Sequence, residues 1–221
     1  MPQTTLHYIY DPLCGWCYAS AALVKTARDL FTKPDAGLDF VLHGGGMMAG
    51  TARQLMSPQL SEFIRQHDAR AAAMTGQPYG DAYTNGLLRD PTVLLDSEPP
   101  TTAILAVQAA AKRGADMLVR VQKAHWVEGR RIAERAVLVE LAADIGVSRE
   151  AFDDSFDSLS GAAVQAHMNE SRRLLERVGG QGFPTFVLER NGQLDMLDFA
   201  RYLTQPDGWR AAIEARVAHV N

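Results

Sequence analysis

The stretch DPLCGWCYAS holds the two cysteines of this 221-residue chain, Cys14 and Cys17. Before it, TLHYIY is an apolar and aromatic run that stops at Asp-Pro, which is typical of a strand followed by a loop. After it, WCYASAALVKTARDLF carries apolar residues at helical spacing without glycine or proline, which predicts one amphipathic helix. LDFVLHGGG then predicts a second strand. The cysteines therefore lie at a strand-to-helix junction in a βαβ unit, whose strands we expect to pair in parallel with a right-handed crossover.

A long helical block follows these elements. From about residue 51 to residue 179 apolar residues recur with helical periodicity, and the sequence gives no strand signal. Ser148 is the predicted N-cap of one helix, with Glu150 and Asp153 in its first turn. The stretches TGQPYGDAYTNG and RDPTVLLDSEPP predict loops. The predicted helices lie near residues 57–75, 101–113, 115–128, 133–145, 148–156 and 161–178.

Strand signals return near the end of the chain. GFPTFVLERNGQLDML contains two apolar runs on either side of Asn191-Gly192, which is a two-residue hairpin signal. DGWRAAIEARVAHV then predicts a closing helix. The predicted order is β-α-β, a helical block and β-β-α. We therefore predict an α/β fold in which a discontinuous domain of residues 1–50 and 180–221 carries an all-helical insertion of residues 51–179.

Composition and charge limit the classes of molecule that we expect this chain to bind. Apolar residues make up 47% of the chain and charged residues 22%, as in ordinary globular proteins. The formal net charge of -4, without a basic stripe, argues against nucleic acid or an anionic membrane as the main partner. MPQTTLHYIYDPL lacks the regions of a signal peptide, and no apolar run of about 20 residues could span a membrane. We therefore expect a cytoplasmic protein, in which a CxxC pair is more often catalytic or metal-binding than a structural disulfide.

The spacing of the cysteines suits thiol–disulfide exchange. Two cysteines one helical turn apart share a helix face and can close a disulfide. The free N–H groups of the first turn favour a thiolate at Cys14, so we expect Cys14 to attack and the shielded Cys17 to resolve the mixed disulfide. Between them, Gly15 adds no bulk and helps to tune the redox potential. Trp16 offers an aromatic surface for local packing or for a peptide substrate.

Metal binding is an alternative use of the same thiols. Structural zinc takes four ligands, commonly two CxxC pairs or cysteines with histidines. This chain has one pair, and its six histidines show no HxxxH spacing, although His43 beside the glycine run is a conceivable third ligand. A chaperone or dithiol module that holds a soft ion is therefore left open. HGGGMMAG lacks the GK[ST] of a phosphate loop, and we expect Met47 and Met48 to line an apolar surface beside the active-site groove.

A second motif lies far from the cysteines, in GGQGFPTFVL, where Phe183-Pro184 opens a predicted strand. A CxxC after the first strand, a Gly-x-Pro-Thr at the head of a β-β-α tail and helices between them resemble the thioredoxin-like fold of the DsbA family across essentially the whole chain. DPLCGWCY and HGGGMMAG resemble its cytoplasmic FrnE-like branch. The resemblance implies that Pro184 is cis and lies against the cysteines as part of the catalytic site. It also implies that Trp16, Phe183 and Thr185 bind the substrate.

The resemblance further implies a protein dithiol–disulfide oxidoreductase or isomerase that works without a metal, through a redox-active disulfide. The expected partners are protein or peptide thiols and disulfides and a redox recycling partner, while glutathione as co-substrate and a homodimer are left open. Asp11 is the nearest match to the acid that many members keep near the sulfurs, and its alternative role is to favour the turn before Pro12. Gly-Trp differs from the Gly-Pro of thioredoxins and the Pro-His of periplasmic DsbA, so neither redox potential transfers.

A different enzyme on the same fold is the runner-up. Kappa-class glutathione transferases and 2-hydroxychromene-2-carboxylate isomerases resemble this architecture, including the helical insertion, and bind glutathione. They use a serine where this chain has Cys14. The presence of Cys17 argues against their chemistry, because it needs no resolving thiol.

Overall fold

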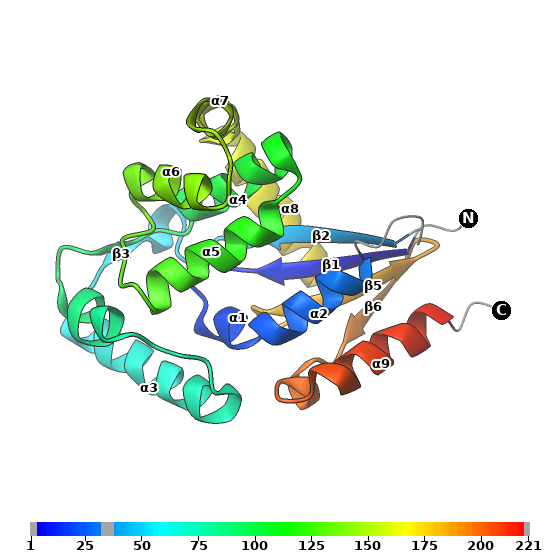
Figure 1. Cartoon of the computed structure of the whole chain (residues 1–221). Coiled ribbons are helices and arrows are strands. Elements are labelled where there is room, and N and C mark those ends of the chain that lie inside the picture. Colours follow the sequence, from blue (N-terminus) through cyan, green and yellow to red (C-terminus); the bar gives the residue numbers. More distant parts are fainter. Residues whose placement is uncertain (1–3, 32–37, 219–221) are drawn as a thin grey trace.

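The computed structural model describes residues 4–31 and 38–218 and shows a sheet flanked by helices, with a helical block beside one end of the strands (Figure 1). The four-stranded sheet has the order β2-β1-β5-β6. The βαβ unit and the C-terminal hairpin are both confirmed. β1 (Thr4–Tyr10) pairs in parallel with β2 (Leu38–Gly44), and the hairpin of β5 (Thr185–Arg190) and β6 (Gln193–Leu197) adds to β1 in antiparallel pairing.

The first face of the sheet carries the larger core. Leu6 and Tyr8 of the central strand β1 are fully buried, as alternation along a strand with one face on the core predicts. The ring of Phe186 lies 4.6 Å from the ring of Tyr8 and 5.1 Å from the ring of Trp209. Trp209 belongs to α9 (Pro206–Ala218), and its indole N–H donates to the Leu23 carbonyl at 3.2 Å. These contacts hold the closing helix against the helix that follows the cysteines.

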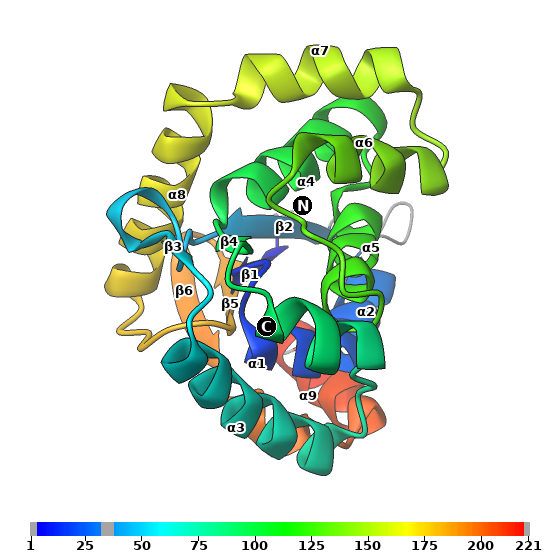
Figure 2. The same cartoon turned by 90° about the vertical axis from the view of Figure 1, so that its left-hand side faces the viewer.

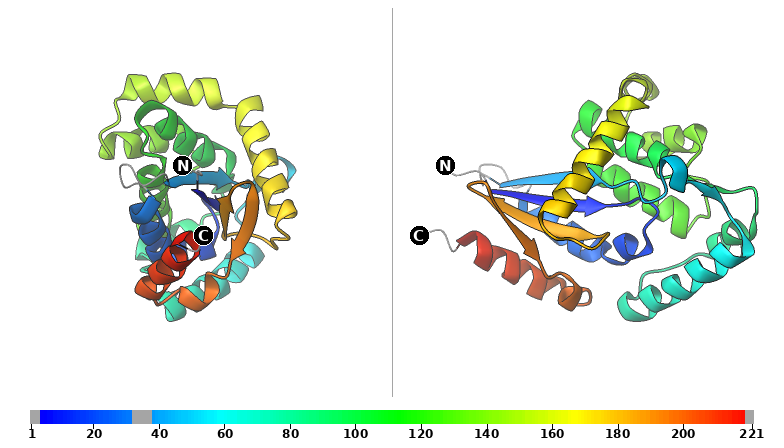
Figure 3. Two further views of the ribbon diagram at one scale, coloured as in Figure 1. Left: turned by 90° about the vertical axis from the view of Figure 1, so that its right-hand side faces the viewer. Right: turned by 180° about the vertical axis from the view of Figure 1, so that it is seen from behind.

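A single long helix covers the opposite face. α8 (Ala162–Arg177) crosses the sheet when the molecule is seen from behind (Figure 3). Ile9 and Val187 point to this side and form a small buried cluster with Leu174 of α8. The alternation of Tyr8 and Ile9 along β1 thus fixes which side of the sheet faces the cysteine helix and which faces α8.

The helix predicted over residues 16–31 is in fact two helices. α1 (Gly15–Ala19) ends at Ser20, and α2 (Ala21–Phe31) begins directly after it. The Ser20 hydroxyl donates to the Cys17 carbonyl at 3.0 Å, so the side chain replaces a backbone donor at the end of α1. The prediction of one continuous helix is wrong at Ser20 because periodicity does not register such a side-chain hydrogen bond.

Helices fill most of the insertion, as predicted. Ser148 is confirmed as an N-cap, since its hydroxyl accepts a hydrogen bond from the Ala151 N–H at 3.3 Å. Asp153 lies in the second turn of that helix and not in the first. The fourth helix begins three residues before the predicted start, because Pro99 and Pro100 fit the first turn, where no N–H is needed. The helices besides α8 are α3 (Pro58–Thr75), α4 (Glu98–Ala111), α5 (Gly114–Trp126), α6 (Arg135–Asp144) and α7 (Arg149–Leu159).

The insertion is not all-helical, which corrects the sequence prediction. β3 (Gln54–Leu55) and β4 (Leu94–Leu95) pair in antiparallel fashion and lie side by side in Figure 2. Two residues are too few to give a strand pattern in the sequence. The segment predicted as a loop over 75–86 contains a turn of π-helix, η2 (Ala82–Gly86). Among residues 4–31 and 38–218, three 3-10 turns complete the elements: η1 (Gly50–Ala52), η3 (Leu87–Arg89) and η4 (Ala200–Tyr202).

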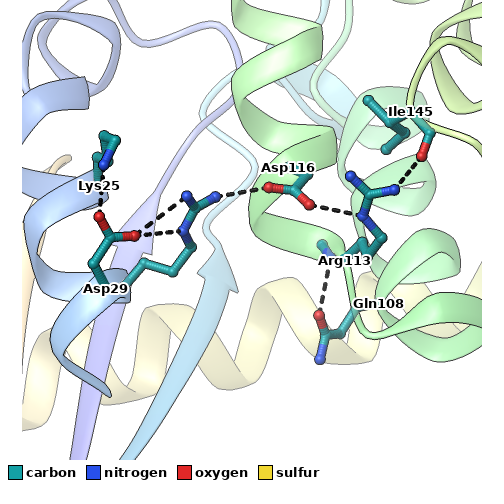
Figure 4. A network of polar contacts seen from close by, with 8 residues as sticks. Lys25, Asp29, Gln108, Arg113, Asp116 and Ile145 are labelled. Carbon is teal, nitrogen blue, oxygen red and sulfur yellow. Dashed lines mark hydrogen bonds and ion pairs between the residues drawn. The ribbon is translucent and has the colours of Figure 1, made fainter. Parts of the chain in front are cut away.

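A chain of ion pairs joins the insertion to α2 (Figure 4). Arg28 of α2 donates to Asp116 of α5 at 2.7 Å, and Arg113 donates to the other oxygen of Asp116 at 2.8 Å. Lys25 pairs with Asp29 one turn away at 2.6 Å. Partly exposed pairs of this kind contribute at most about 1 kcal/mol each to the stability of a protein. We therefore infer that they orient the insertion relative to α2 and add little to its stability.

The closing helix was predicted over 207–220, and α9 covers it to residue 218, with residues 219 and 220 outside the described part of the chain. Within the described ranges, none of the helices has the length and apolar character needed to cross a membrane.

Candidate active site

Cys14 and Cys17 lie on the first turn of α1, at the end of the loop that follows β1. Cys14 is the N-cap residue, and its carbonyl accepts hydrogen bonds from the Cys17 and Tyr18 N–H groups at 3.0 and 3.1 Å. Both thiols are free. Cys14 is 6% exposed and Cys17 is 0% exposed, so a reagent reaches Cys14 first. The order of access is the one expected for an attacking and a resolving thiol.

Burial sets the protonation of the inner cysteine. Desolvation raises the pKa of the Cys17 thiol well above its usual value, and the neighbouring Cys14 raises it further. The Tyr8 hydroxyl lies 3.5 Å from the Cys17 carbonyl, beneath the same turn. Cys17 is therefore a thiol in the free protein, and a base must take its proton before it can attack.

The second motif meets the cysteines in space. The Phe183–Pro184 peptide bond is cis, and the Cys14 Sγ–H group donates to the Phe183 carbonyl oxygen at 3.4 Å. Pro184 is buried, whereas the Thr185 hydroxyl donates to the Gly182 carbonyl at 2.8 Å. The Thr185 hydroxyl is thus used within the loop, and its predicted contact with a substrate finds no support in its side chain.

Asp11 anchors the loop that leads into the cysteine helix. Its carboxylate accepts hydrogen bonds from the Leu13 N–H at 2.8 Å, from the Met47 N–H at 2.5 Å and from the Ser97 hydroxyl at 2.9 Å. Burial raises the pKa of Asp11 to about 6, although these three donors and Arg172 oppose the rise. The buried acid expected near the sulfurs is therefore present. It also ties the cysteine loop to the glycine run and to the start of α4.

The Phe183 ring packs closely against Gly45 of the glycine run. A Cβ atom on Gly45 would lie 2.1 Å from the Phe183 ring, so only glycine leaves room for it. Arg172 of α8 donates to the carbonyls of Gly45 at 2.7 Å and Gly46 at 2.5 Å. These contacts fix the backbone on which Phe183 rests, and with it the carbonyl that faces Cys14.

A pocket of about 180 Å³ opens beside Cys14. The cysteine loop forms one wall, Met47 and Met48 after the glycine run form part of the lining, and residues of the insertion form the rest. Its apolar lining bears out the expectation that Met47 and Met48 flank the site. Trp16 is half-buried on its wall. The lining residues are Leu13, Cys14, Gly15, Trp16, Met47, Met48, Met56, Leu60, Phe63, Ile64, His67, Asp68, Tyr83, Leu88, Leu95, His125 and Trp126.

The insertion contacts the cysteine helix through Tyr18. The Tyr18 hydroxyl donates to the Pro78 carbonyl at 2.7 Å, and the Gln77 amide donates to the Tyr18 carbonyl at 3.1 Å. The Tyr18 ring also stacks on Trp126 at 4.8 Å. The roles of Gln77 and Pro78 were not identified from the sequence, because residues 75–86 were predicted only as a loop. Tyrosines at 79 and 83 within that polar stretch were the available signal.

The zinc alternative gains no support from His43. Its Nε2 atom lies 2.9 Å from His7 Nδ1, and its ring stacks on His167 at 6.2 Å. In the part of the chain that the structure describes, no group of three or more histidine, cysteine or acidic side chains could hold a metal ion. His43 is therefore a packing residue between β1 and α8, not a partner of the cysteines.

Comparison with known proteins places this site in a family. The sequence model of the DSBA-like thioredoxin domain matches residues 5–203, which include both cysteines, the cis proline and the insertion. The chain belongs to the DSBA-like thioredoxin family. Its thioredoxin-like α/β fold and its CxxC pair make it a thiol–disulfide oxidoreductase, as other family members are.

Solved structures of this family include close relatives. The cytosolic disulfide reductase DsbM from Pseudomonas aeruginosa is 52% identical, with a TM-score of 0.87 over 96% of this chain and 98% of that one. Its structure with GSH matches with 50% identity and a TM-score of 0.86 over the same shares. A putative protein disulfide isomerase from Nitrosomonas europaea shares the fold at 20% identity, with a TM-score of 0.80 over 99% of this chain and 100% of that one. Curated proteins gave no significant sequence match.

Proposed function

We propose that this family member is a cytoplasmic disulfide reductase that acts on protein or peptide disulfides, with Cys14 as nucleophile and Cys17 as resolving thiol. The observation that carries the proposal is the position of Cys14: its sulfur borders the pocket and faces the Phe183 carbonyl, while Cys17 is fully buried behind it. The direction rests on the likeness to a cytosolic disulfide reductase at 52% identity. The same likeness supports a cytoplasmic location.

The first step is attack by the Cys14 thiolate on one sulfur of the substrate disulfide. The S–S bond of the substrate breaks, a bond forms between Cys14 and one substrate sulfur, and the other sulfur leaves as a thiolate that takes a proton. The backbone of Phe183 beside the cis bond can align an extended peptide for this attack, as an added strand does. Trp16 on the pocket wall offers an apolar contact to the same peptide.

The second step needs Cys17 as a thiolate. Asp11 is buried near Cys17, and its raised pKa suits it to accept the Cys17 proton near neutral pH. The Cys17 thiolate then attacks the Cys14 sulfur, the mixed disulfide breaks, and the substrate leaves with its second thiol. The substrate disulfide has gained two electrons and two protons, and the enzyme holds a Cys14–Cys17 disulfide.

The third step returns the enzyme to its dithiol. Two molecules of glutathione can reduce the Cys14–Cys17 disulfide through a mixed disulfide at Cys14 and leave as oxidised glutathione. The solved complex of DsbM with GSH supports glutathione as the recycling partner. The proposal needs no metal ion, because all electrons pass between sulfur atoms.

Turnover of a fluorescent peptide disulfide in the presence of reduced glutathione tests this function. Wild-type protein should accelerate its reduction, Cys14→Ser should not, and Cys14→Ser should remain folded by circular dichroism. Equal turnover by the wild type and Cys14→Ser would refute the assigned nucleophile. A homodimer is a separate proposal, which sedimentation of the full chain tests.

A further inference from the structure

The pocket beside Cys14 contains a buried carboxyl group from the insertion. Asp68 lies on α3 and is 7% exposed. A Cβ atom added to Gly15 would lie 2.6 Å from Asp68 Oδ1, closer than Cβ atoms approach other heavy atoms in proteins. The carboxyl group therefore occupies the space that any side chain at position 15 would need. A residue more than fifty positions away thus accounts for the glycine between the cysteines.

The carboxyl group has a neutral partner. The Tyr83 hydroxyl donates to Asp68 Oδ2 at 2.6 Å, and Tyr83 is itself buried. No lysine or arginine among the described residues forms an ion pair with Asp68. When Asp68 is ionised, no ion pair among the described residues cancels its charge, and the apolar pocket that it shares with Cys14 screens that charge less than water would.

The groups around Asp68 determine when it carries that charge. Burial raises the pKa of Asp68 to about 6, and the Tyr83 hydrogen bond opposes the rise. His125 across the pocket is neutral at this pH, because burial lowers its pKa to about 4. The titratable or charged side chains that line the cavities on the two sides of Asp68 are Cys14, His67, Tyr83 and His125 on one side and Arg65, Tyr79 and Tyr83 on the other.

We propose that Asp68 is a positioning residue of the redox pair: its carboxylate packs closely against position 15 and, from the pocket that it lines together with Cys14, disfavours the Cys14 thiolate. A less stable thiolate makes the dithiol a stronger reductant, because a stabilised reduced form is what makes such a pair oxidising. The insertion thereby supplies an electrostatic control on the chemistry of the thioredoxin-like domain. The inference rests on the proposed function in one respect, namely that Cys14 is the reactive thiol.

Alkylation of Cys14 by iodoacetamide tests the inference without any disulfide substrate. The rate is measured from about pH 4 to pH 9 in a Cys17→Ser background, so that a single thiol remains. Asp68→Asn removes the charge and keeps the size of the side chain. It should raise the rate roughly three- to tenfold on the rising limb of the profile above pH 6, with little change at pH 5, where Asp68 is largely protonated. Glu62→Gln, which removes an exposed charge from the same helix, should leave the profile unchanged.

Tyr83→Phe provides a second, independent readout. It keeps the carboxyl group but removes its hydrogen-bond donor, which raises the pKa of Asp68 and delays its ionisation to higher pH. The alkylation rate of Tyr83→Phe should exceed that of the protein that keeps Tyr83 near pH 6, and the two rates should converge at higher pH. Equal rates for Asp68→Asn and its parent, or a ratio that is the same at every pH, would overturn the inference. Absence of disulfide turnover in all variants would instead count against the proposed function.

Discussion

The Cys14 thiol lies 3.4 Å from the carbonyl oxygen of Phe183, although 169 residues separate the two in the chain. The contact joins the first half of the thioredoxin-like domain to the second, across the whole insertion. It places the sulfur of the proposed nucleophile beside the backbone that precedes the cis proline. The proposed active site is therefore complete only when both halves of the sheet are assembled, and substitutions that move Phe183 should act on Cys14.

Gly45→Ala should lower the activity although both cysteines are unchanged. The added methyl group would enter the space of the Phe183 ring, 2.1 Å from its atoms, and displace the residue that faces Cys14. We expect kcat/KM for peptide disulfide reduction to fall about tenfold or more, since small displacements at a reacting centre have effects of this size. Gly86→Ala is the matched control, because nothing lies within 4 Å of the Cβ atom there. An unchanged kcat/KM for Gly45→Ala would show that the position of Phe183 does not matter.

Cys17→Ser should trap the mixed disulfide. Without the resolving thiol, Cys14 still attacks oxidised glutathione, but the adduct cannot collapse to an internal disulfide. Intact-mass measurement should show one glutathione bound to Cys17→Ser and none to Cys14→Ser. Accumulation of the adduct on Cys14→Ser would mean that Cys17 is the attacking thiol, against its complete burial.

Gly15→Ala should destabilise the folded protein through Asp68. The new Cβ atom meets the Asp68 carboxyl oxygen at 2.6 Å, so either the buried Asp68 side chain or the backbone of α1 must shift. Overpacking of this kind costs about 1–3 kcal/mol in the free energy of unfolding, which urea denaturation measures.

A double-mutant cycle assigns that cost to the contact. Asp68→Ala removes the obstacle, so Gly15→Ala should cost less in the Asp68→Ala background than in the wild type. Equal costs in the two backgrounds would show that Gly15 is required for another reason.

Asp11 should make stability fall as pH rises through the acidic range. Its pKa is about 6 in the folded protein, whereas an unfolded aspartate titrates at about 3.9. Between these values the folded state holds more protons than the unfolded state, so its stability decreases with increasing pH. This rise in the pKa of Asp11 corresponds to a loss of stability on the order of 2–3 kcal/mol between about pH 4 and pH 6.

Urea denaturation of the wild type and of Asp11→Asn across this pH range isolates the contribution of Asp11 to the free energy of unfolding. The variant should show a flatter dependence on pH than the wild type, whatever its stability at a single pH. Identical slopes would mean that the pKa of Asp11 is the same in the folded and unfolded states.

Sequence patterns were enough for the βαβ unit and the C-terminal hairpin, whereas the meeting of Cys14 with Phe183-Pro184 was expected from the family resemblance. Cys14 lies after a strand of clear alternation, and Phe183-Pro184 precedes another, so their topology follows from local signals. The hairpin at Asn191-Gly192 and the cap at Ser148 were predictable because each depends on a few adjacent residues.

The contribution of the insertion to the site was not predictable in this way. Asp68 lies on a helix of weak amphipathic pattern, and Tyr83 lies in a stretch that has the composition of a loop. Their importance arises from contact with Gly15, which no spacing in the sequence encodes. The break at Ser20 and the two-residue strands β3 and β4 were missed for a similar reason, since each depends on hydrogen bonds too local or too short to give a period.

The equilibrium reduction potential of the Cys14–Cys17 pair tests the central claim most directly. Purified protein is equilibrated in glutathione buffers of graded ratio, and tryptophan fluorescence reports the redox state through Trp16 beside the thiols. A disulfide reductase should show a reversible two-electron transition near the value of thioredoxin, about -270 mV, and Cys14→Ser should show none. A transition near the value of DsbA, about -120 mV, or no reversible transition, would contradict the account.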